Sequence, residues 1–358
     1  MVPFAERQRK AEEMENLIRS WDGEYVVLRY DREAEAWMFI AIHSTVLGNA
    51  AGGTRLKVYA TPGDGLRDAQ RLATGMTYKW AGIDFPQGGG KGVIALSRPV
   101  DGEARDRLLE RYGELVESLR GAFATGADLG VGPEQVKVIA RETTHVFGVR
   151  GGGDPGPWTA LGVFTAIEAV AEELFGAPDV QGRTVLVQGI GDVGVPLAKR
   201  LAEAGAKLKL ADIDTERVAG VAGELDGVII HPAQVYAESC DIFAPCAEGG
   251  ILNEYTIPQL CCKGIAGAAN NQLAVAEDAD RLHQRGILYA PDFIANSGGA
   301  IALCGLEALA MSDDYVVRKI LSIRDTLHLV FREAADNDES PEAAAERRVR
   351  RILERGPA

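Results

Sequence analysis

The sequence predicts an α/β fold of two domains, the second built on a parallel β-sheet. At 358 residues the chain is longer than one ordinary domain. From residue 159 onward, short β-branched runs alternate with helical patterns, which is typical of parallel strands joined by crossover helices. Between the two halves stands GGGDPGP, at residues 151–157, where glycines and prolines interrupt regular structure. We therefore place the domain junction there.

The first half mixes helices and strands. Apolar residues recur at helical or alternating spacing in six segments. In chain order we expect a helix over 5–20, strands over 24–31 and 36–45, a helix over 66–79, a strand over 92–96 and a helix over 105–119.

The second half follows the alternating pattern to the C-terminal region. We expect helices over 159–176 and 193–205, and strands over 184–189, 207–212, 227–230, 241–245, 264–269 and 286–291. The last helix is expected over 340–356, with Ser340 at its N-cap, Pro341 at its first position and Gly356 after its end.

Composition excludes several classes of function. The net charge is −14, and so acidic a surface repels phosphate backbones, which argues against nucleic-acid binding. Hydrophobic residues make up 46% of the chain, enough for a buried core. The first 21 residues are charged throughout, so we expect no signal peptide. Because no stretch of about 18 apolar residues occurs, we expect no membrane span.

The cysteines indicate a reducing compartment. There are five, an odd number, and none forms a C-x-x-C pair: Cys240, Cys246, Cys261, Cys262 and Cys304. A disulfide framework or a zinc site is therefore not expected, and we place the chain in the cytoplasm with no metal site.

A dinucleotide-binding motif follows the strand expected over 184–189. Gly189, Gly191 and Gly194 have G-x-G-x-x-G spacing between a β-run and a helix, and the next strand ends in Asp212. These glycines allow a tight turn, a close approach of the pyrophosphate and helix packing. Asp212 would bind the ribose hydroxyls and repel the 2′-phosphate of NADP, so we expect NAD. Arg217, five positions later in the sequence, leaves NADP open. The turn residues Asp192 and Val193 belong to the same predicted cofactor site.

Two lysines stand near each other in the first half. Lys91 follows three glycines in GGGKG, which we interpret as a loop of small residues, and Lys79 lies 12 positions earlier. A lysine among apolar groups or beside another cation loses proton affinity, so Lys91 could serve as a base. Lys79 could hold an anion such as a carboxylate.

Eight motifs occur in one order and carry a resemblance over roughly residues 25–350. They are GGTR (52–55), GMTYK (75–79), GGGKG (88–92), GADLG (126–130), TALGVF (159–164), APCAEGGILN (244–253), AGAANNQL (266–273) and LYAPDFIANSGGAI (288–301). Together they resemble the glutamate/leucine/phenylalanine/valine dehydrogenase family, and its shorter branch that acts on apolar amino acids. The resemblance implies reversible NAD-dependent oxidative deamination of an L-amino acid to a 2-oxo acid and ammonia.

The resemblance also implies residue roles. Lys79 would bind the substrate carboxylate, Lys91 would activate the attacking water, and Asp128 would move protons to and from the substrate nitrogen. The remaining contacts implied for substrate and cofactor are Gly52, Gly53, Thr159, Ala247, and Asn270 or Asn271.

The implied side-chain pocket consists of Ala51, Gly126, Ala300 and Leu303. Three of these are small and leave room for a ring, so the favoured substrate is L-phenylalanine. Leucine or valine, tryptophan, and a catalytically impaired amino acid sensor remain alternatives, and an acidic scaffold subunit explains none of the motifs. The sequence departs from many relatives at residues 131–133, where Val-Gly-Pro replaces threonines that hold the nicotinamide end.

The resemblance implies a discontinuous first domain. Residues 1–150 and 326–358 would form the substrate-binding and oligomerisation domain, and residues 151–325 the Rossmann-type NAD-binding domain. A homo-oligomer formed through the first domain is expected.

Overall fold

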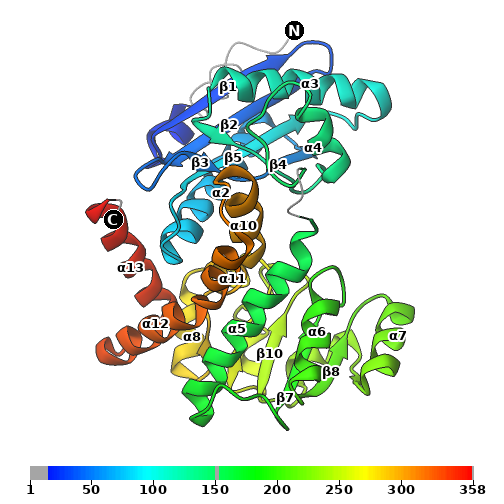
Figure 1. The fold of residues 1–358 in the computed structure, drawn as a ribbon, viewed down its shortest axis with the longest axis vertical. Helices are drawn as coiled ribbons and strands as arrows, with labels where there is room; N and C mark the ends of the chain where they lie inside the picture. The colour runs from blue at the N-terminus through cyan, green and yellow to red at the C-terminus, as the bar shows by residue number, and fades with distance from the viewer. Residues whose placement is uncertain (1–14, 150–152, 357–358) are drawn as a thin grey trace. The chain divides into compact units, whose positions relative to one another are not determined.

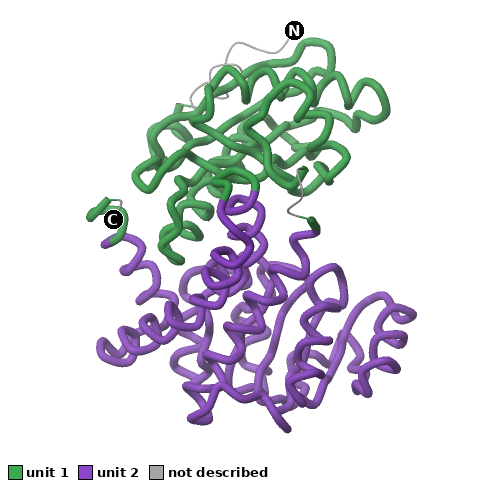
Figure 2. The backbone as a smooth tube through the Cα atoms, viewed as in Figure 1, with its two compact units in different colours: residues 1–153, 307–310, 352–358 green, residues 154–306, 311–351 purple. Residues whose placement is uncertain are grey.

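The computed structural model of the chain describes residues 15–149 and 153–356. Most of the helix predicted over 5–20 lies outside these residues. The structure divides into two compact units, coloured separately in Figure 2. The first comprises residues 1–153, 307–310 and 352–358, and the second comprises residues 154–306 and 311–351.

The first unit is built on a mixed six-stranded sheet. Its order is β1-β2-β5-β3-β6, and β4 pairs with β5 beyond the end of β3. The strands are β1 (Tyr25–Asp31), β2 (Ala36–Ser44), β3 (Ala50–Ala51), β4 (Thr54–Val58), β5 (Gly88–Leu96) and β6 (Phe123–Ala124). The predicted strands at 24–31 and 36–45 are confirmed, whereas the short strands β3, β4 and β6 were not predicted.

Helices cover both faces of this sheet. Helix α2 (Pro62–Gly82) packs on one face through Leu66, Ala69 and Ala73. Helices α3 (Gly102–Ser118) and α4 (Pro133–Ile139) contribute apolar side chains to the larger core on the other face. The two helices predicted here over 66–79 and 105–119 are thus confirmed as α2 and α3, and each is longer at its N-terminal end.

The second unit contains a six-stranded sheet in which every pairing is parallel, of order β12-β11-β10-β7-β8-β9. The strands are β7 (Thr184–Gln188), β8 (Lys207–Ala211), β9 (Val228–Ile229), β10 (Ile242–Pro245), β11 (Gly264–Ile265) and β12 (Leu288–Tyr289). In order of appearance this is 6-5-4-1-2-3, the doubly wound order of dinucleotide-binding sheets. All six predicted strands are confirmed, and the expected Rossmann-type fold with them.

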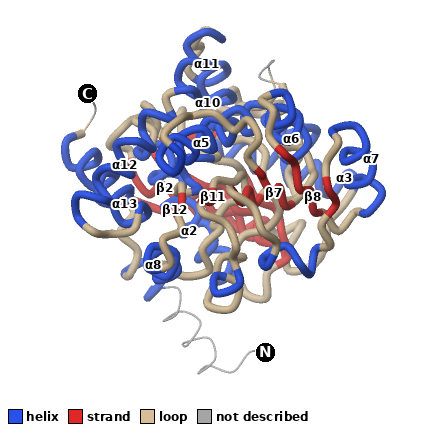
Figure 3. Tube along the Cα trace, turned by 90° about the horizontal axis from the view of Figure 1, so that it is seen from below, coloured by secondary structure: helices blue, strands red, loops and turns tan. Residues whose placement is uncertain are grey.

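Helices α5 (Pro155–Phe175), α6 (Gly194–Glu203) and α7 (Thr215–Leu225) pack around this sheet, as Figures 1 and 3 show. The two prolines of GGGDPGP lie in the first turn of α5, where a missing N–H costs nothing. Asp154 caps that turn by accepting the Gly156 N–H at 2.8 Å. The helix therefore begins four residues before the predicted start.

The division of the C-terminal helices differs from the predicted one. Helix α12 (Ile323–Asn337) packs on α5, where Glu172 accepts from Arg324 and His328 at 2.8 and 2.9 Å. Residues 326–351 consequently belong to the second unit, although the sequence assigned them to the first domain. The boundary falls near the end of α13 (Pro341–Arg355), where Arg355 pairs with Asp84 of the first unit at 3.7 Å. Within the described residues, no helix is both long and apolar enough to cross a bilayer.

Candidate active site

The GGGKG motif forms the first part of β5, a nine-residue strand that is buried along its whole length. A Cβ atom on Gly89 would lie 1.9 Å from the Thr77 hydroxyl, and one on Gly92 would lie 2.0 Å from the Tyr112 hydroxyl. Side chains at these positions would clash with their neighbours on both faces. The interpretation of GGGKG as a loop is therefore wrong, because the glycines serve close packing inside a central strand.

Lys91 points toward the face of the sheet that α2 covers. Successive strand residues face opposite sides, and Gly89 and Val93 both contact the α2 side. The exposed fraction of Lys91 is only 5%. Its ammonium group forms an ion pair with the carboxylate of Asp128. The structure thus brings together the two residues that the resemblance implied as catalytic.

Asp128 begins a tight turn that ends at Val131. The two residues exchange backbone hydrogen bonds of 3.1 and 2.9 Å. Gly130 adopts φ +77°, which the third position of a type II turn requires. Val131 is fully buried, and Pro133 begins α4. The departure at residues 131–133 thus has a structural role, because it closes the turn that presents Asp128.

A second charged pair supports Asp128. Arg55 of β4 donates from Nε to Asp128 Oδ1 at 2.9 Å and from a terminal nitrogen to Asp68 Oδ2 at 3.0 Å. Tyr59 donates to the same Asp68 oxygen at 2.6 Å. The side chains of Arg55, Asp68 and Asp128 are 15–20% exposed. Sequence reasoning missed Arg55 as a site residue, although it is the last residue of GGTR.

Burial and charge act in opposite directions on this cluster. Burial lowers the pKa of Lys91 and outweighs the effect of Asp128, which raises it, while the nearby Arg55 lowers it further. Burial alone would raise the pKa of Asp128, but the ion pairs with Lys91 and Arg55 outweigh it and lower that pKa to about 2. The arrangement therefore favours an ionised carboxylate beside an amine that gives up its proton more easily than a free lysine.

Gly52 and Gly53 occupy the step between β3 and β4, beside Lys91. A Cβ atom on Gly52 would lie 1.9 Å from the Gly90 carbonyl oxygen, and one on Gly53 would lie 2.3 Å from that of Ala127. Ala51 pairs in register with Gly89. These residues accordingly let two backbones approach closely around the lysine.

Lys79 lies on α2, two residues after the Thr77 that packs on Gly89. Its side chain is half-buried. The helix is held there by Trp80, whose indole N–H donates to the Ala51 carbonyl at 3.1 Å. Lys79 therefore belongs to the helix that covers the sheet face toward which Lys91 points.

The space beside Gly126 is already filled. A Cβ atom at Gly126 would lie 2.3 Å from the ring of Phe147, which is 7% exposed. Phe147 is fixed by its backbone N–H, which donates to Thr125 at 2.9 Å. The room left by Gly126 is therefore taken by a protein ring, and Phe147 is a further neighbour of the implied pocket that sequence reasoning missed.

The dinucleotide motif lies at the edge of the second unit's sheet where the strand order reverses. Gly189 adopts φ +93°, and its position contacts Ala247, which follows β10. A Cβ atom on Gly194 would lie 1.9 Å from the Gly189 carbonyl oxygen. At Gly191, in contrast, a Cβ atom would meet no heavy atom of the described residues within 4 Å. This opening before the N-terminus of α6 fits a pyrophosphate group.

Asp212 follows β8 and faces the same turn. Its carboxylate accepts the N–H groups of Ile190 at 2.6 Å and Asp214 at 2.8 Å. Arg217 forms an ion pair with Asp214 at 2.9 Å. Asp212 is consequently oriented by the glycine-rich turn itself, as a ribose-binding carboxylate requires.

The remaining predicted residues of the second unit lie on five segments. Thr159 is on α5 beside Gly299. Asn270 accepts from the buried Asn296 at 2.8 Å, and Asn271 accepts the Gly250 N–H at 2.7 Å. Helix α10 (Gly298–Leu303) contributes Ala300 and Leu303. The other predicted site residues of this group are Thr159, Asp192, Val193, Ala247, Asn270 and Asn271. They all belong to the second unit, whereas Lys79, Lys91 and Asp128 belong to the first.

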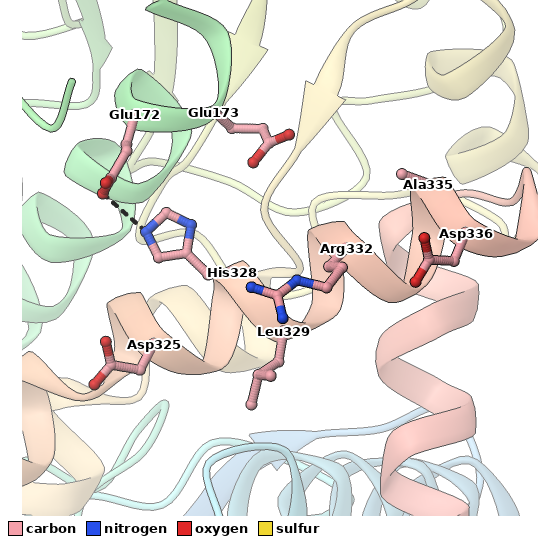
Figure 4. Close-up of a pocket in the computed structure, with 8 residues that line it drawn as sticks. All are labelled: Glu172, Glu173, Asp325, His328, Leu329, Arg332, Ala335 and Asp336. Atoms are coloured by element: carbon pink, nitrogen blue, oxygen red, sulfur yellow. Dashed lines mark hydrogen bonds and ion pairs between the residues drawn. The ribbon is translucent and has the colours of Figure 1, made fainter. Parts of the chain in front are cut away.

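A separate pocket of about 710 Å³ lies between α5 and α12 (Figure 4). Its lining is highly charged, and Figure 4 shows the His328–Glu172 contact between two of the lining residues. The residues that line it are Glu172, Glu173, Asp325, His328, Leu329, Arg332, Ala335 and Asp336. None of these was predicted as a site residue, so the pocket is distinct from the predicted site.

A parallel sheet with a dinucleotide turn, in one chain with a buried lysine–carboxylate pair, defines a nucleotide-dependent enzyme. A family model described as Glu/Leu/Phe/Val dehydrogenase, dimerisation domain, matches residues 29–145. A second, described as Glutamate/Leucine/Phenylalanine/Valine dehydrogenase, matches residues 154–215 and 209–354. The chain belongs to this family of amino acid dehydrogenases, which are oxidoreductases.

Relatives with different substrates are similarly close. The chain is 38% identical to leucine dehydrogenase from Geobacillus stearothermophilus, over 96% of this chain and 94% of the relative. It is also 38% identical to phenylalanine dehydrogenase from Lysinibacillus sphaericus, over 92% and 88%. The crystal structure of L-tryptophan dehydrogenase from Nostoc punctiforme superposes with a TM-score of 0.84 at 37% identity, over 95% and 98%. Overall similarity therefore does not distinguish among these three substrates.

Proposed function

We propose that the chain catalyses the reversible, NAD-dependent oxidative deamination of an apolar L-amino acid to its 2-oxo acid and ammonia. The observation that carries the proposal is the buried ion pair between Lys91 and Asp128. A lysine of lowered pKa can act as a base near the pH at which an amino acid is deaminated. A carboxylate in direct contact with it can pass protons on.

Each residue has one part in the proposed reaction. Lys79 binds the substrate carboxylate, which orients the α-carbon. Bound NAD supplies the acceptor for the hydride that leaves this carbon. Lys91, in its neutral form, takes a proton from the water that attacks the resulting imino carbon. Asp128 exchanges protons with the substrate nitrogen, which leaves as ammonia. The backbone of Gly52 and Gly53, which packs closely against the Gly90 and Ala127 carbonyls, helps to seat the substrate beside these groups.

NAD is proposed over NADP because of Asp212. Its carboxylate is held by two backbone N–H groups and presents negative charge where a 2′-phosphate would lie. Arg217 is engaged by Asp214, which reduces its availability to a phosphate.

L-phenylalanine remains the proposed substrate, with leucine or valine and tryptophan as the alternatives. Ala51 and Ala300 are small, which favours a large side chain. The ring of Phe147 next to Gly126 adds an aromatic surface. Because an apolar pocket discriminates by only about 1–3 kcal/mol per methylene, the preference should be graded rather than absolute.

A homo-oligomer assembled through the first unit is also proposed. Strand β1 is an edge strand, and Leu28 and Tyr30 on it are 49% and 43% exposed. An unpaired strand edge can pair with another chain, and exposed apolar side chains beside it favour burial in an interface. The family model that matches this region is described as a dimerisation domain. All five cysteines are free, which supports the proposed cytoplasmic location.

The test is a turnover assay with purified protein. NADH formation would be followed at alkaline pH with NAD and each of L-phenylalanine, L-tryptophan, L-leucine, L-valine and L-glutamate. The highest kcat/KM is expected for phenylalanine. Lys91→Ala should abolish turnover while NAD still binds. If no amino acid is turned over although NAD binds, the proposal fails and the alternative of a catalytically impaired amino acid sensor is favoured.

A further inference from the structure

We propose that Arg55 is a positioning residue. Asp68, which is itself bonded by Tyr59, holds Arg55 in place, and Arg55 in turn engages one oxygen of Asp128 and leaves the other for Lys91 and the substrate. This inference rests on the proposed function of Lys91 and Asp128. It assigns a supporting role in the reaction to two charged residues behind this pair, Arg55 on β4 and Asp68 on α2.

The two oxygens of Asp128 have different partners. Oδ1 accepts from Arg55 Nε at 2.9 Å and from the Leu129 backbone N–H at 2.6 Å. Oδ2 faces the Lys91 ammonium group. A carboxylate held by two donors on one oxygen cannot rotate without breaking both bonds. Proton exchange is therefore restricted to Oδ2.

Arg55 is itself held in a fixed plane. Its guanidinium group bonds Asp128 with Nε and Asp68 with a terminal nitrogen at 3.0 Å. Tyr59 and Arg71 fix Asp68 at 2.6 and 2.9 Å. A planar fork of donors can span two carboxylates, which the single ammonium of a lysine cannot do in the same geometry.

Charge gives the cluster a second effect. Three groups act on Lys91 from three elements: Asp128 from the turn, Arg55 from β4 and Asp68 from α2. Lys79 also belongs to α2. Arg55 lowers the proton affinity of Lys91, whereas Asp128 and Asp68 raise it. The Arg55–Asp68 pair thus adjusts how readily Lys91 becomes the neutral base.

Opposite charge changes should therefore have opposite effects on the pH profile. The acidic limb of kcat/KM reports the group that must lose a proton in the free enzyme, here Lys91. Arg55→Met removes a cation and should move this limb to higher pH by about one pH unit, whereas Asp68→Asn removes an anion and should move it to lower pH. A merely structural role would lower activity without moving the limb in opposite directions.

Two further variants separate the geometric role of Arg55, which is to hold Asp128, from the effect of its charge on Lys91. Arg55→Lys keeps the charge but loses the fork, so kcat should fall about 10- to 100-fold while the limb stays near its wild-type position. Combining Arg55→Met with Asp68→Leu removes both charges, so the limb should return toward the wild-type pH while kcat stays low.

The experiment compares these full-length variants with wild type in kcat/KM profiles across neutral and alkaline pH. Arg67→Met is the matched control, since Arg67 pairs with the exposed Asp64 on the same helix at 2.8 Å and should leave the profile unchanged. Thermal unfolding and NAD binding check that each variant is folded. If Arg55→Met does not fold, Asp68→Asn and Arg55→Lys carry the test.

The proposal is overturned if Arg55→Met and Asp68→Asn move the limb in the same direction or leave both limb and kcat at wild-type values. If Lys91→Ala is inactive in the same experiments, that result contradicts only the proposed role of Arg55 and leaves the proposed function of Lys91 intact. If Lys91→Ala is itself active, the proposed function of Lys91 fails instead.

Discussion

Lys91 and Asp128 are 37 residues apart in the chain, yet their side chains form a direct ion pair. The lysine comes from a central strand, and the aspartate from a turn closed by Val131. A lysine on such a strand needs a counter-ion because an unpaired buried ammonium is costly. The pair therefore couples the stability of the first unit to the groups proposed for catalysis.

The first prediction concerns acid stability. The pKa of Asp128 is about 2 in the folded chain, below its ordinary value of 3.8. The lowered pKa means that the carboxylate stabilises the folded state above about pH 4, and that this stabilisation is lost as pH falls from about 4 to about 2, by roughly 2 kcal/mol. In Asp128→Asn this contribution is absent.

Urea unfolding of both proteins between neutral pH and about pH 2 measures the effect, since the other carboxylates are common to the two. Wild type should be the more stable at neutral pH, and its advantage should narrow as the pH falls below about 4. A difference that stays constant with pH would show that Asp128 is not held by its cationic partners.

The second prediction concerns Gly126 and Phe147. Because a Cβ atom at residue 126 would lie 2.3 Å from the Phe147 ring, Gly126→Ala should lower the free energy of unfolding by about 1–3 kcal/mol. Phe147→Leu in the same chain should recover part of this loss. A double-mutant cycle by chemical unfolding checks the coupling. Independent, additive effects of the two substitutions would contradict the contact.

The same pair bears on substrate choice. If the Phe147 ring borders the side-chain pocket, Phe147→Ala should raise kcat/KM for tryptophan relative to phenylalanine by up to about tenfold. The ratio, measured under identical conditions, separates a change in pocket size from a general loss of activity. An unchanged ratio would place Phe147 outside the pocket.

The strands of the parallel sheet could be predicted from the sequence, whereas most of strand β5, which holds Lys91, could not. Strands such as 184–189 and 207–212 could be predicted because each is a short apolar run followed by a helix. GGGKG was interpreted as a loop because glycine is rare in strands. Its glycines are explained by residues distant in the sequence, such as Thr77 and Tyr112, that pack against the strand.

The charged cluster shows a second limit. Lys91 and Asp128 were assigned through motifs, but nothing in the sequence near Arg55 predicts that it joins Asp128 to Asp68. That contact depends on three segments meeting in space. Likewise, Gly126 suggested free volume, since a single sequence does not reveal that a ring 21 positions later fills it.

The third prediction compares two glycines of the dinucleotide turn. Gly194→Ala should destabilise the second unit, because its Cβ atom would lie 1.9 Å from the Gly189 carbonyl oxygen. The Cβ atom of Gly191→Ala would meet no heavy atom within 4 Å in the part of the chain that the structure describes, so this variant should fold with an unchanged melting temperature. It should nevertheless weaken NAD binding about tenfold or more, because the methyl group occupies the approach of the pyrophosphate.

Thermal unfolding and NAD titration of the two variants separate these effects. Gly191→Ala serves as the folded reference for Gly194→Ala. Wild-type NAD affinity in Gly191→Ala would show that the pyrophosphate does not approach this glycine.

The last prediction concerns cofactor choice. Asp212→Ser removes the negative charge that opposes a 2′-phosphate but keeps a hydroxyl that can accept a hydrogen bond. The ratio of kcat/KM for NADP to that for NAD should rise about tenfold or more, since about 1.4 kcal/mol corresponds to tenfold. Adding Arg217→Ala should reduce this gain, because Arg217 is then no longer present to pair with the phosphate.

Asp212→Ser also affects the stability of the turn, because the Asp212 carboxylate accepts the Ile190 and Asp214 N–H groups. Melting temperatures of the single and double variants therefore accompany the kinetics. A ratio that does not change in Asp212→Ser would mean that this carboxylate does not face the ribose, and NAD preference would have to arise elsewhere in the second unit.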